Sequence, residues 1–201
     1  GIMITASHNP YFDNGIKVFS STGEKITKLE EKEIEELLDK EMVFSFSSNL
    51  GKVDTSNRYL IDYVSYLKSN LLDSNEKLLI DCSNGVMSNI VPLVFDHHVD
   101  YKLINSSPNG KNINLNCGSE HLESLINTMN EDYTIGISFD GDGDRIGIID
   151  EKGNYIPTDK FMIIIIRSLI KTSECKKYLY DVKCSKSLED EIKILGGEPI
   201  C

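Results

Sequence analysis

The chain has 201 residues, of which 40% are hydrophobic and 26% are charged, and its formal net charge is -11. This composition is typical of a globular protein, and the acidic balance excludes a basic surface for nucleic acid, so we expect no nucleic-acid partner. The longest apolar run, residues 161–166, is far shorter than the ~20 residues that cross a bilayer, and we therefore expect no membrane association.

The first part of the chain predicts two helices. Thr27 and Glu30 have the spacing of a capping box, and a helix is expected from residue 29 to 41. Apolar residues recur on one face from about residue 56 to 70, which predicts a second helix. Its tyrosines are expected to pack in the core or at its rim: Tyr59, Tyr63 and Tyr66.

Strands and helices alternate in the rest of the chain. We expect strands at 77–82, 100–104, 134–139, 146–149 and 177–181, and helices at 86–95, 120–130, 159–170 and 185–195. The alternation predicts an α/β fold with mixed, mostly parallel sheets sandwiched by helices, and ligand loops at the carboxyl ends of strands. Boundaries near residues 70–76 and Pro157 divide the chain into segments 1-70, 71-157 and 158-201.

Residues 140–145, Asp-Gly-Asp-Gly-Asp-Arg, directly follow one expected strand. Alternate side chains of an extended strand lie roughly 6.5–7 Å apart, too far for three short carboxylates to converge on one ion. Gly141 and Gly143 lack a Cβ, so we expect the backbone to turn through positive φ and bring the carboxylates together. Hard oxygen ligands of this kind suit Mg²⁺, and the adjacent Arg145 suits a phosphate.

A calcium loop between two helices is the main alternative for this segment. Asp140, Asp142 and Asp144 match its first ligand positions, and Glu151 matches its last one. However, the sixth position should be the glycine of a sharp turn and is Arg145 instead. The segments on either side, residues 134–139 and 146–149, also favour strands over the helices of a calcium loop, because both segments are short and rich in isoleucine.

A second group of reactive side chains lies near the start of the chain. Ser7 is a candidate nucleophile or phosphoryl carrier, and His8 is a candidate base. The turn that follows directs Lys17 back toward them as an acid, a base or a phosphate ligand. A capping turn is the structural alternative for the serine segment. The asparagine-rich residues 109–116 are interpreted in the same way, as a polar loop or as a functional one.

Three segments together resemble the α-D-phosphohexomutase family: Thr5-Ala6-Ser7-His8-Asn9-Pro10, Asp13-Asn14-Gly15-Ile16-Lys17 and Asp140-Gly141-Asp142-Gly143-Asp144-Arg145. The resemblance implies that Ser7 carries a phosphoryl group. It also implies that three aspartates bind Mg²⁺ together with Ser7: Asp140, Asp142 and Asp144. It implies that Arg145 steadies the phosphoserine and that His8 and Lys17 transfer protons with the sugar hydroxyls. Lys183 matches a segment that approaches the substrate.

The resemblance also implies a four-domain enzyme that interconverts hexose 6-phosphate and hexose 1-phosphate through a hexose bisphosphate. Segment 1-70 would be the later part of domain 1 with the phosphoserine loop, 71-157 domain 2 with the metal loop, and 158-201 the start of domain 3. Further sugar and phosphate loops would lie beyond Cys201, so we expect the chain to be part of a longer protein. An inactive fragment that binds Mg²⁺ or a phosphosugar is the alternative of another class.

Two subgroups of the family share features with this chain. Residues 11–24, 107–114 and 117–119 resemble phosphoglucosamine mutase, whereas residues 147–149 and 181–185 are more similar to phosphomannomutase/phosphoglucomutase. The glucosamine enzyme is favoured narrowly. The five cysteines are scattered without metal-ligand or redox spacing, and no signal peptide is recognisable, so we expect reduced thiols and a cytoplasmic location.

Overall fold

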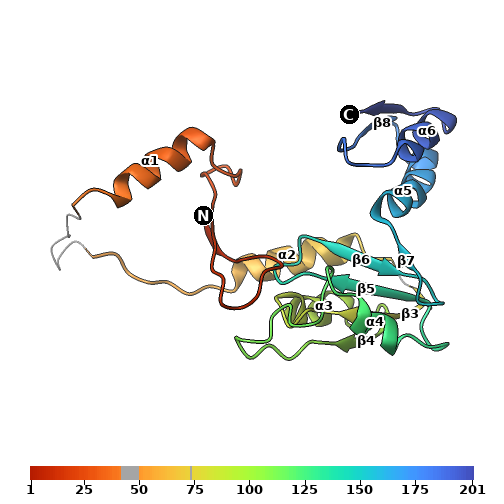
Figure 1. The fold of residues 1–201 in the computed structure, drawn as a ribbon, viewed down its shortest axis with the longest axis horizontal. Coiled ribbons are helices and arrows are strands. Elements are labelled where there is room, and N and C mark those ends of the chain that lie inside the picture. The colour runs from red at the N-terminus through yellow and green to blue at the C-terminus, as the bar shows by residue number, and fades with distance from the viewer. Residues whose placement is uncertain (42–49, 73) are drawn as a thin grey trace.

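The computed structural model describes residues 1–41, 50–72 and 74–201. Figure 1 shows an N-terminal part with α1, a central sheet with α2, α3 and α4 beside it, and a separate C-terminal unit with α5 and α6. Among the described residues, no helix has both the length and the apolar character needed to cross a membrane.

The N-terminal part presents a loop to the central sheet. β1 (Ile2–Ile4) pairs antiparallel with β2 (Ile16–Val18), so residues 5–15 form the connection between them. Helix α1 (Lys28–Leu38) begins at the predicted capping box, in which Thr27 accepts from the Glu30 N–H and Glu30 accepts from the Thr27 N–H. The helix therefore starts where expected and ends three residues early, with Asp39 as its C-cap.

Helix α2 (Arg58–Ser69) corrects one prediction. Its tyrosines are exposed, with Tyr59 at 80% and Tyr66 at 67%, so the expectation that they pack in the core or at its rim is wrong. The helix contacts α3 (Met87–Phe95), and its half-buried residues include Val64 and Leu67 rather than the tyrosines. The apolar periodicity predicted helix α2 correctly. Which side of α2 is buried depends on where α3 packs against it, and the periodicity does not show this.

The central domain is a five-stranded sheet in the order β4-β3-β5-β6-β7. Its strands are β3 (Lys77–Asp81), β4 (Asp100–Ile104), β5 (Ile135–Phe139), β6 (Ile146–Ile149) and β7 (Tyr155–Ile156). β3 pairs parallel with β4 and with β5, whereas β6 pairs antiparallel with β5 and with β7. The predicted mixed α/β fold is confirmed, with more antiparallel pairing than expected. Residues 140–145 and 150–154 are connections too short for a parallel crossover, which takes a dozen residues or more.

Alternate residues of β3 face two separate cores. Leu79 packs with Leu125 of helix α4 (Glu123–Thr128), whereas Ile80 packs with Val91 of α3. Since side chains of a strand alternate between faces, α3 and α4 cover opposite sides of the sheet. The sheet is thus sandwiched between helices as predicted, although α4 is shorter than the helix expected at 120–130.

The arrangement places two loops at one edge of the sheet. Asp81 at the end of β3 is in register with Ser138 of β5, so the turn after β3 and the loop after β5 emerge side by side. The Val86 N–H donates to the Gly141 carbonyl at 3.0 Å and joins them. This edge, at the carboxyl ends of parallel strands, is where α/β folds bind ligands.

The C-terminal unit has a core of its own. It consists of α5 (Thr158–Thr172), β8 (Lys177–Leu179), α6 (Lys186–Ile194) and β9 (Glu198–Ile200), with β8 parallel to β9. Ile166 of α5 packs with Leu188 and Ile192 of α6. Ser185 caps α6 through its side chain, which accepts from the Ser187 N–H. The predicted elements are present, but the strand expected at 177–181 ends at Leu179.

Candidate functional site

Three aspartates converge in the loop between β5 and β6. Asp140, Asp142 and Asp144 each offer a carboxylate oxygen, and these oxygens lie within 4.8 Å of one another. Asp140 is buried and Asp144 is exposed, with Asp142 between these extremes. Because strands rather than helices flank the loop, the interpretation as a helix-loop-helix calcium site is wrong.

The two glycines of the loop have different roles. Gly143 has a φ of +74°, as the predicted turn through positive φ requires. Gly141 does not adopt positive φ, which corrects the prediction; its role is close approach. A Cβ at Gly141 would lie 2.6 Å from the Ser7 carbonyl oxygen and 2.9 Å from the Asn114 amide nitrogen. Gly141 therefore lets the aspartate loop and the serine loop touch.

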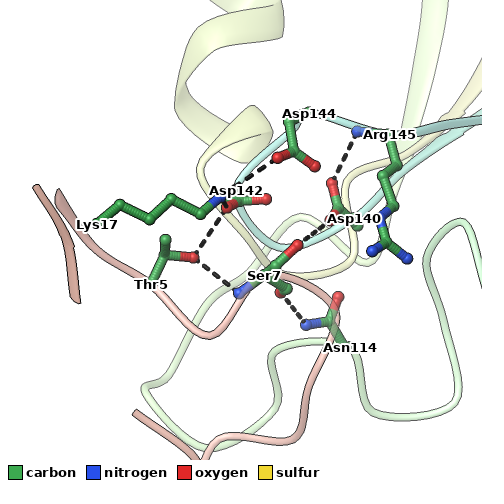
Figure 2. Close-up of polar contacts among 8 residues, drawn as sticks. All are labelled: Thr5, Ser7, Lys17, Asn114, Asp140, Asp142, Asp144 and Arg145. Atoms are coloured by element: carbon green, nitrogen blue, oxygen red, sulfur yellow. Dashed lines mark hydrogen bonds and ion pairs between the residues drawn. The ribbon is translucent and has the colours of Figure 1, made fainter. Parts of the chain in front are cut away.

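Ser7 faces the aspartates although it lies 133 positions away in the sequence. Its Oγ donates to Asp140 Oδ2 at 2.8 Å, and its N–H donates to Thr5 Oγ1 at 2.9 Å (Figure 2). The other oxygen of Asp140 accepts from the Arg145 N–H at 3.1 Å. These contacts connect the serine hydroxyl to Asp140, the most buried carboxylate of the cluster. The two sequence motifs therefore lie at one site, as predicted.

Asp142 accepts hydrogen bonds on its Oδ2 from two side chains of the β1–β2 region. Its Oδ2 accepts from Lys17 Nζ at 2.8 Å and from Thr5 Oγ1 at 3.1 Å. Burial by itself raises the pKa of Asp142, but the hydrogen bonds from Lys17 and Thr5 outweigh it and hold the pKa below its usual value. The hydrogen bond to Asp142 in turn raises the pKa of Lys17 against the effect of burial, and a second bond to Asp144 Oδ2 at 3.3 Å adds to it.

The cluster has the properties of a site for a hard divalent cation. Asp142 Oδ1 is buried and has no hydrogen-bond partner among the described residues. A buried oxygen of this kind needs a donor or an ion. Together with the oxygens of the neighbouring aspartates and the Ser7 hydroxyl, it forms an all-oxygen donor set of the kind that binds Mg²⁺. The residues present therefore fit the predicted metal.

The side chains of the other predicted residues form no hydrogen bond with Ser7 or the aspartates among the described residues. Arg145 forms an ion pair with Glu120, Nη1 to Oε1 at 2.7 Å, through its side chain. His8 is exposed. Lys183 belongs to the C-terminal unit, where it lines a separate cavity of about 360 Å³ with Asp159 and Asp181. The structure thus brings together Ser7, Lys17 and the aspartates.

A cavity of about 520 Å³ opens beside Ser7 and Asp142. Its lining comes from β1 and the β1–β2 connection, the turn after β3 and the start of α3, the loop after β4, and the aspartate loop. Polar side chains among the lining residues include Thr5, Asn84 and Asn89. The volume falls within the range of small-molecule sites, roughly 300–1,000 Å³. A small molecule could therefore occupy the cavity next to the serine hydroxyl.

Asn114 is a site residue that the sequence interpretation did not single out. Its Nδ2 donates to the Ser7 carbonyl at 2.8 Å and to the Asn9 carbonyl at 3.1 Å. Thr5 was part of the quoted motif without a role, and it connects Ser7 to Asp142. The asparagine-rich stretch and the resemblance of residues 107–114 included Asn114, but neither gave it a role.

Comparisons with known proteins agree with this geometry. Two family models match the chain: "Phosphoglucomutase/phosphomannomutase, alpha/beta/alpha domain I" over residues 1–43, and domain II of the same family over residues 58–153. The chain belongs to the phosphoglucomutase/phosphomannomutase family. The predicted resemblance to the α-D-phosphohexomutases is therefore confirmed.

Relatives of this family cover nearly the whole chain. A phosphoglucosamine mutase of Psychromonas ingrahamii is 38% identical over 98% of the chain, and one of Nitrosococcus oceani is 44% identical over 87% of it. The chain spans 46% and 40% of the length of these relatives, less than half of either. The activity of a whole relative is therefore not shown for this chain.

Solved structures of the family share the fold. A putative phosphomannomutase from Thermus thermophilus matches 99% of the chain and 47% of its own chain, with a TM-score of 0.82 at 21% identity. An N-acetylphosphoglucosamine mutase from Aspergillus fumigatus, solved with GlcNAc-6P and magnesium, matches 100% of the chain and 55% of its own, with a TM-score of 0.67 at 17% identity. At these identities the likeness establishes the fold alone.

Proposed function

We propose that the protein containing this chain interconverts hexose 6-phosphate and hexose 1-phosphate by way of a phosphoserine at Ser7 and a hexose bisphosphate. The observation that carries the proposal is the hydrogen bond of 2.8 Å between Ser7 Oγ and Asp140 Oδ2 within the aspartate cluster. A serine hydroxyl in that position can hold a phosphoryl group next to a bound cation. The family membership and the named relatives support the same reaction.

Residues on both loops would hold Mg²⁺: Asp140, Asp142 and Asp144, together with the oxygen on Ser7. Once bound, the ion supplies positive charge that stabilises the phosphoryl group during transfer. Lys17 supplies further positive charge from the chain itself. Arg145 is proposed to steady the phosphoserine, although its guanidinium is paired with Glu120 in this structure. Because its pKa is raised, Lys17 stays protonated near neutral pH and is suited to be a phosphate partner. Its role as an acid or a base in proton transfer with the sugar hydroxyls is proposed on the family resemblance.

The transfer conserves all atoms and protons. The bond between phosphorus and Ser7 Oγ breaks while a sugar hydroxyl oxygen forms a new bond to phosphorus, which produces the bisphosphate. The proton of that hydroxyl passes to a base, for which His8 is the candidate, and Ser7 Oγ recovers a proton. Transfer of the other phosphoryl group back to Ser7 then releases the isomeric monophosphate.

We propose glucosamine phosphate as the substrate, because the curated relatives named here are phosphoglucosamine mutases. Lys183 is proposed as a substrate ligand contributed by the C-terminal unit. The phosphomannomutase/phosphoglucomutase activity is the second candidate, favoured by residues 147–149 and 181–185. Rates of the whole protein on glucosamine, mannose and glucose 6-phosphates would distinguish the two, and a clear preference for mannose or glucose would reject the first.

The decisive experiment replaces the proposed carrier. Ser7→Ala should abolish mutase activity in the whole protein, because no other hydroxyl is held on Asp140 among the described residues. Ser21→Ala, at an exposed serine of the same region, is the matched control and should remain active. After incubation with a hexose 1,6-bisphosphate and Mg²⁺, intact-mass measurement should show one phosphoryl group on wild-type protein and none on Ser7→Ala. Full turnover by Ser7→Ala would reject the proposal, and an unlabelled wild-type protein would favour the inactive binding fragment.

A further inference from the structure

Asn114 connects the loop after β4 to the loop that carries Ser7. Its side-chain amide donates to two backbone carbonyls, those of Ser7 at 2.8 Å and Asn9 at 3.1 Å. Figure 2 shows this amide directed at Ser7 from the side away from Lys17. One side chain therefore holds the backbone on both sides of His8.

The donor is itself fixed to the central sheet. The Asn114 N–H donates to the carbonyl of Ser83 at 2.9 Å, and Ser83 is fully buried in the turn after β3. Asn84, next in that turn, donates from Nδ2 to the Asn112 carbonyl at 3.2 Å. Asn114 has a φ of 56°, in the left-handed region that asparagine tolerates better than most residues. The amide is thus presented from a backbone anchored beside β3.

Ser7 requires such support because of its own conformation. Its φ of 54° lies in the left-handed region, which a serine rarely adopts without help from its surroundings. The Thr5 hydroxyl holds its N–H, and the Asn114 amide holds its carbonyl. Gly141 packs against that carbonyl, and it can do so because glycine has no Cβ that would clash with the carbonyl oxygen. The direction of Ser7 Oγ toward Asp140 depends on these contacts.

We propose that Asn114 is a positioning residue for phosphoryl transfer: it holds the Ser7 loop in the conformation that directs the hydroxyl at Asp140. This inference rests on the proposed role of Ser7 as the phosphoryl carrier. Asn114 bonds the backbone of the loop and not the Ser7 hydroxyl, so it acts through Ser7. Its loss should therefore slow transfer at saturating phosphoryl donor and leave the concentration for half-maximal rate nearly unchanged.

The test compares glycine substitutions at two asparagines of one loop in the whole protein. Asn114→Gly removes the amide and keeps the freedom to adopt positive φ. Asn116→Gly is the matched control, because Asn116 has a φ of 53° and an exposed side chain. Asn114→Asp keeps the size of the side chain but replaces the donor with an acceptor, and it serves as the second variant if the glycine variant does not fold.

Two measurements are made on each variant. The first is the rate of Ser7 phosphorylation with Mg²⁺ over a series of hexose 1,6-bisphosphate concentrations, followed by intact mass, which gives both the saturating rate and the half-maximal concentration. We expect a fall of about tenfold to a hundredfold for both Asn114 variants, in keeping with the effect of a displacement near 1 Å on a reacting group. The second is hydrogen exchange, which should be faster at residues 5–9 and unchanged in β3 and β5.

The outcomes separate this inference from the proposed function. Slow labelling of both Asn114 variants, with a wild-type rate for Asn116→Gly and intact protection of β3 and β5, supports the positioning role. A wild-type rate for Asn114→Gly overturns it, and so does a slow rate accompanied by loss of protection throughout the sheet. An unlabelled wild-type protein overturns the proposed function, and with it the role assigned to Asn114.

Discussion

Gly141→Ala should disrupt the contact between the two loops that form the site. The added Cβ would lie 2.6 Å from the Ser7 carbonyl oxygen, 2.8 Å from Ile113 Cδ1 and 2.9 Å from Asn114 Nδ2. Real Cβ atoms do not approach other atoms this closely, so the serine loop or the aspartate loop must move. Because the nearest atom belongs to the backbone, a change of rotamer does not relieve the clash.

The magnitude follows from the size of this overlap. Extra carbon in a well-packed position costs about 1–3 kcal/mol, which sets the expected loss in the free energy of unfolding. An ordinary contact requires a separation near 3.4–4 Å, so the two loops must separate by about 1 Å, which can cost about a hundredfold in rate. The Ser7 Oγ to Asp140 Oδ2 hydrogen bond of 2.8 Å would not survive such a shift.

Urea unfolding and the rate of Ser7 phosphorylation measure the two effects. Gly51→Ala is the matched control, because a Cβ at Gly51 meets no atom within 4 Å. It should leave both quantities near their wild-type values. Wild-type stability and labelling in Gly141→Ala would refute the conclusion that close approach of the loops is what this glycine provides.

Two further predictions concern titratable groups. In metal-free buffer, Lys17→Met should lower the free energy of unfolding at pH 7 by about 1 kcal/mol. The lowered pKa of Asp142 means that this contribution is present above the unfolded value of 3.8 and is lost as pH falls through the lower folded value. Urea titrations at pH 7 and pH 2 measure it, and an equal deficit at both would contradict the ion pair. Burial raises the pKa of Cys82 to about 12 and of Cys117 to about 11, so neither should react with iodoacetamide in native protein at pH 8, whereas the exposed Cys175 should. Peptide mass mapping would show the pattern, and rapid modification of Cys82 would contradict the buried position given to β3.

The elements of the central domain were predictable from local patterns. The isoleucine-rich runs on both sides of residues 140–145 predicted β5 and β6, and the same runs argued against a calcium loop. In the N-terminal part, the capping box at Thr27 predicted the start of α1 in the same way. Such signals were sufficient because each depends on neighbours within a few positions. The exposed face of α2 was predicted wrongly, because periodicity shows which residues share a face and not which face is covered.

The sequence by itself determined the composition of the site: a serine loop, an aspartate loop with glycines, and a lysine after a tight turn. Only the tertiary structure decided which of these residues meet. It placed Ser7 on Asp140 and Lys17 on Asp142, paired Arg145 with Glu120, and brought in Asn114. The physical reason is that a motif specifies chemistry and local conformation, whereas contacts across more than a hundred residues depend on the register of β3 with β5 and on how the loops at that edge pack.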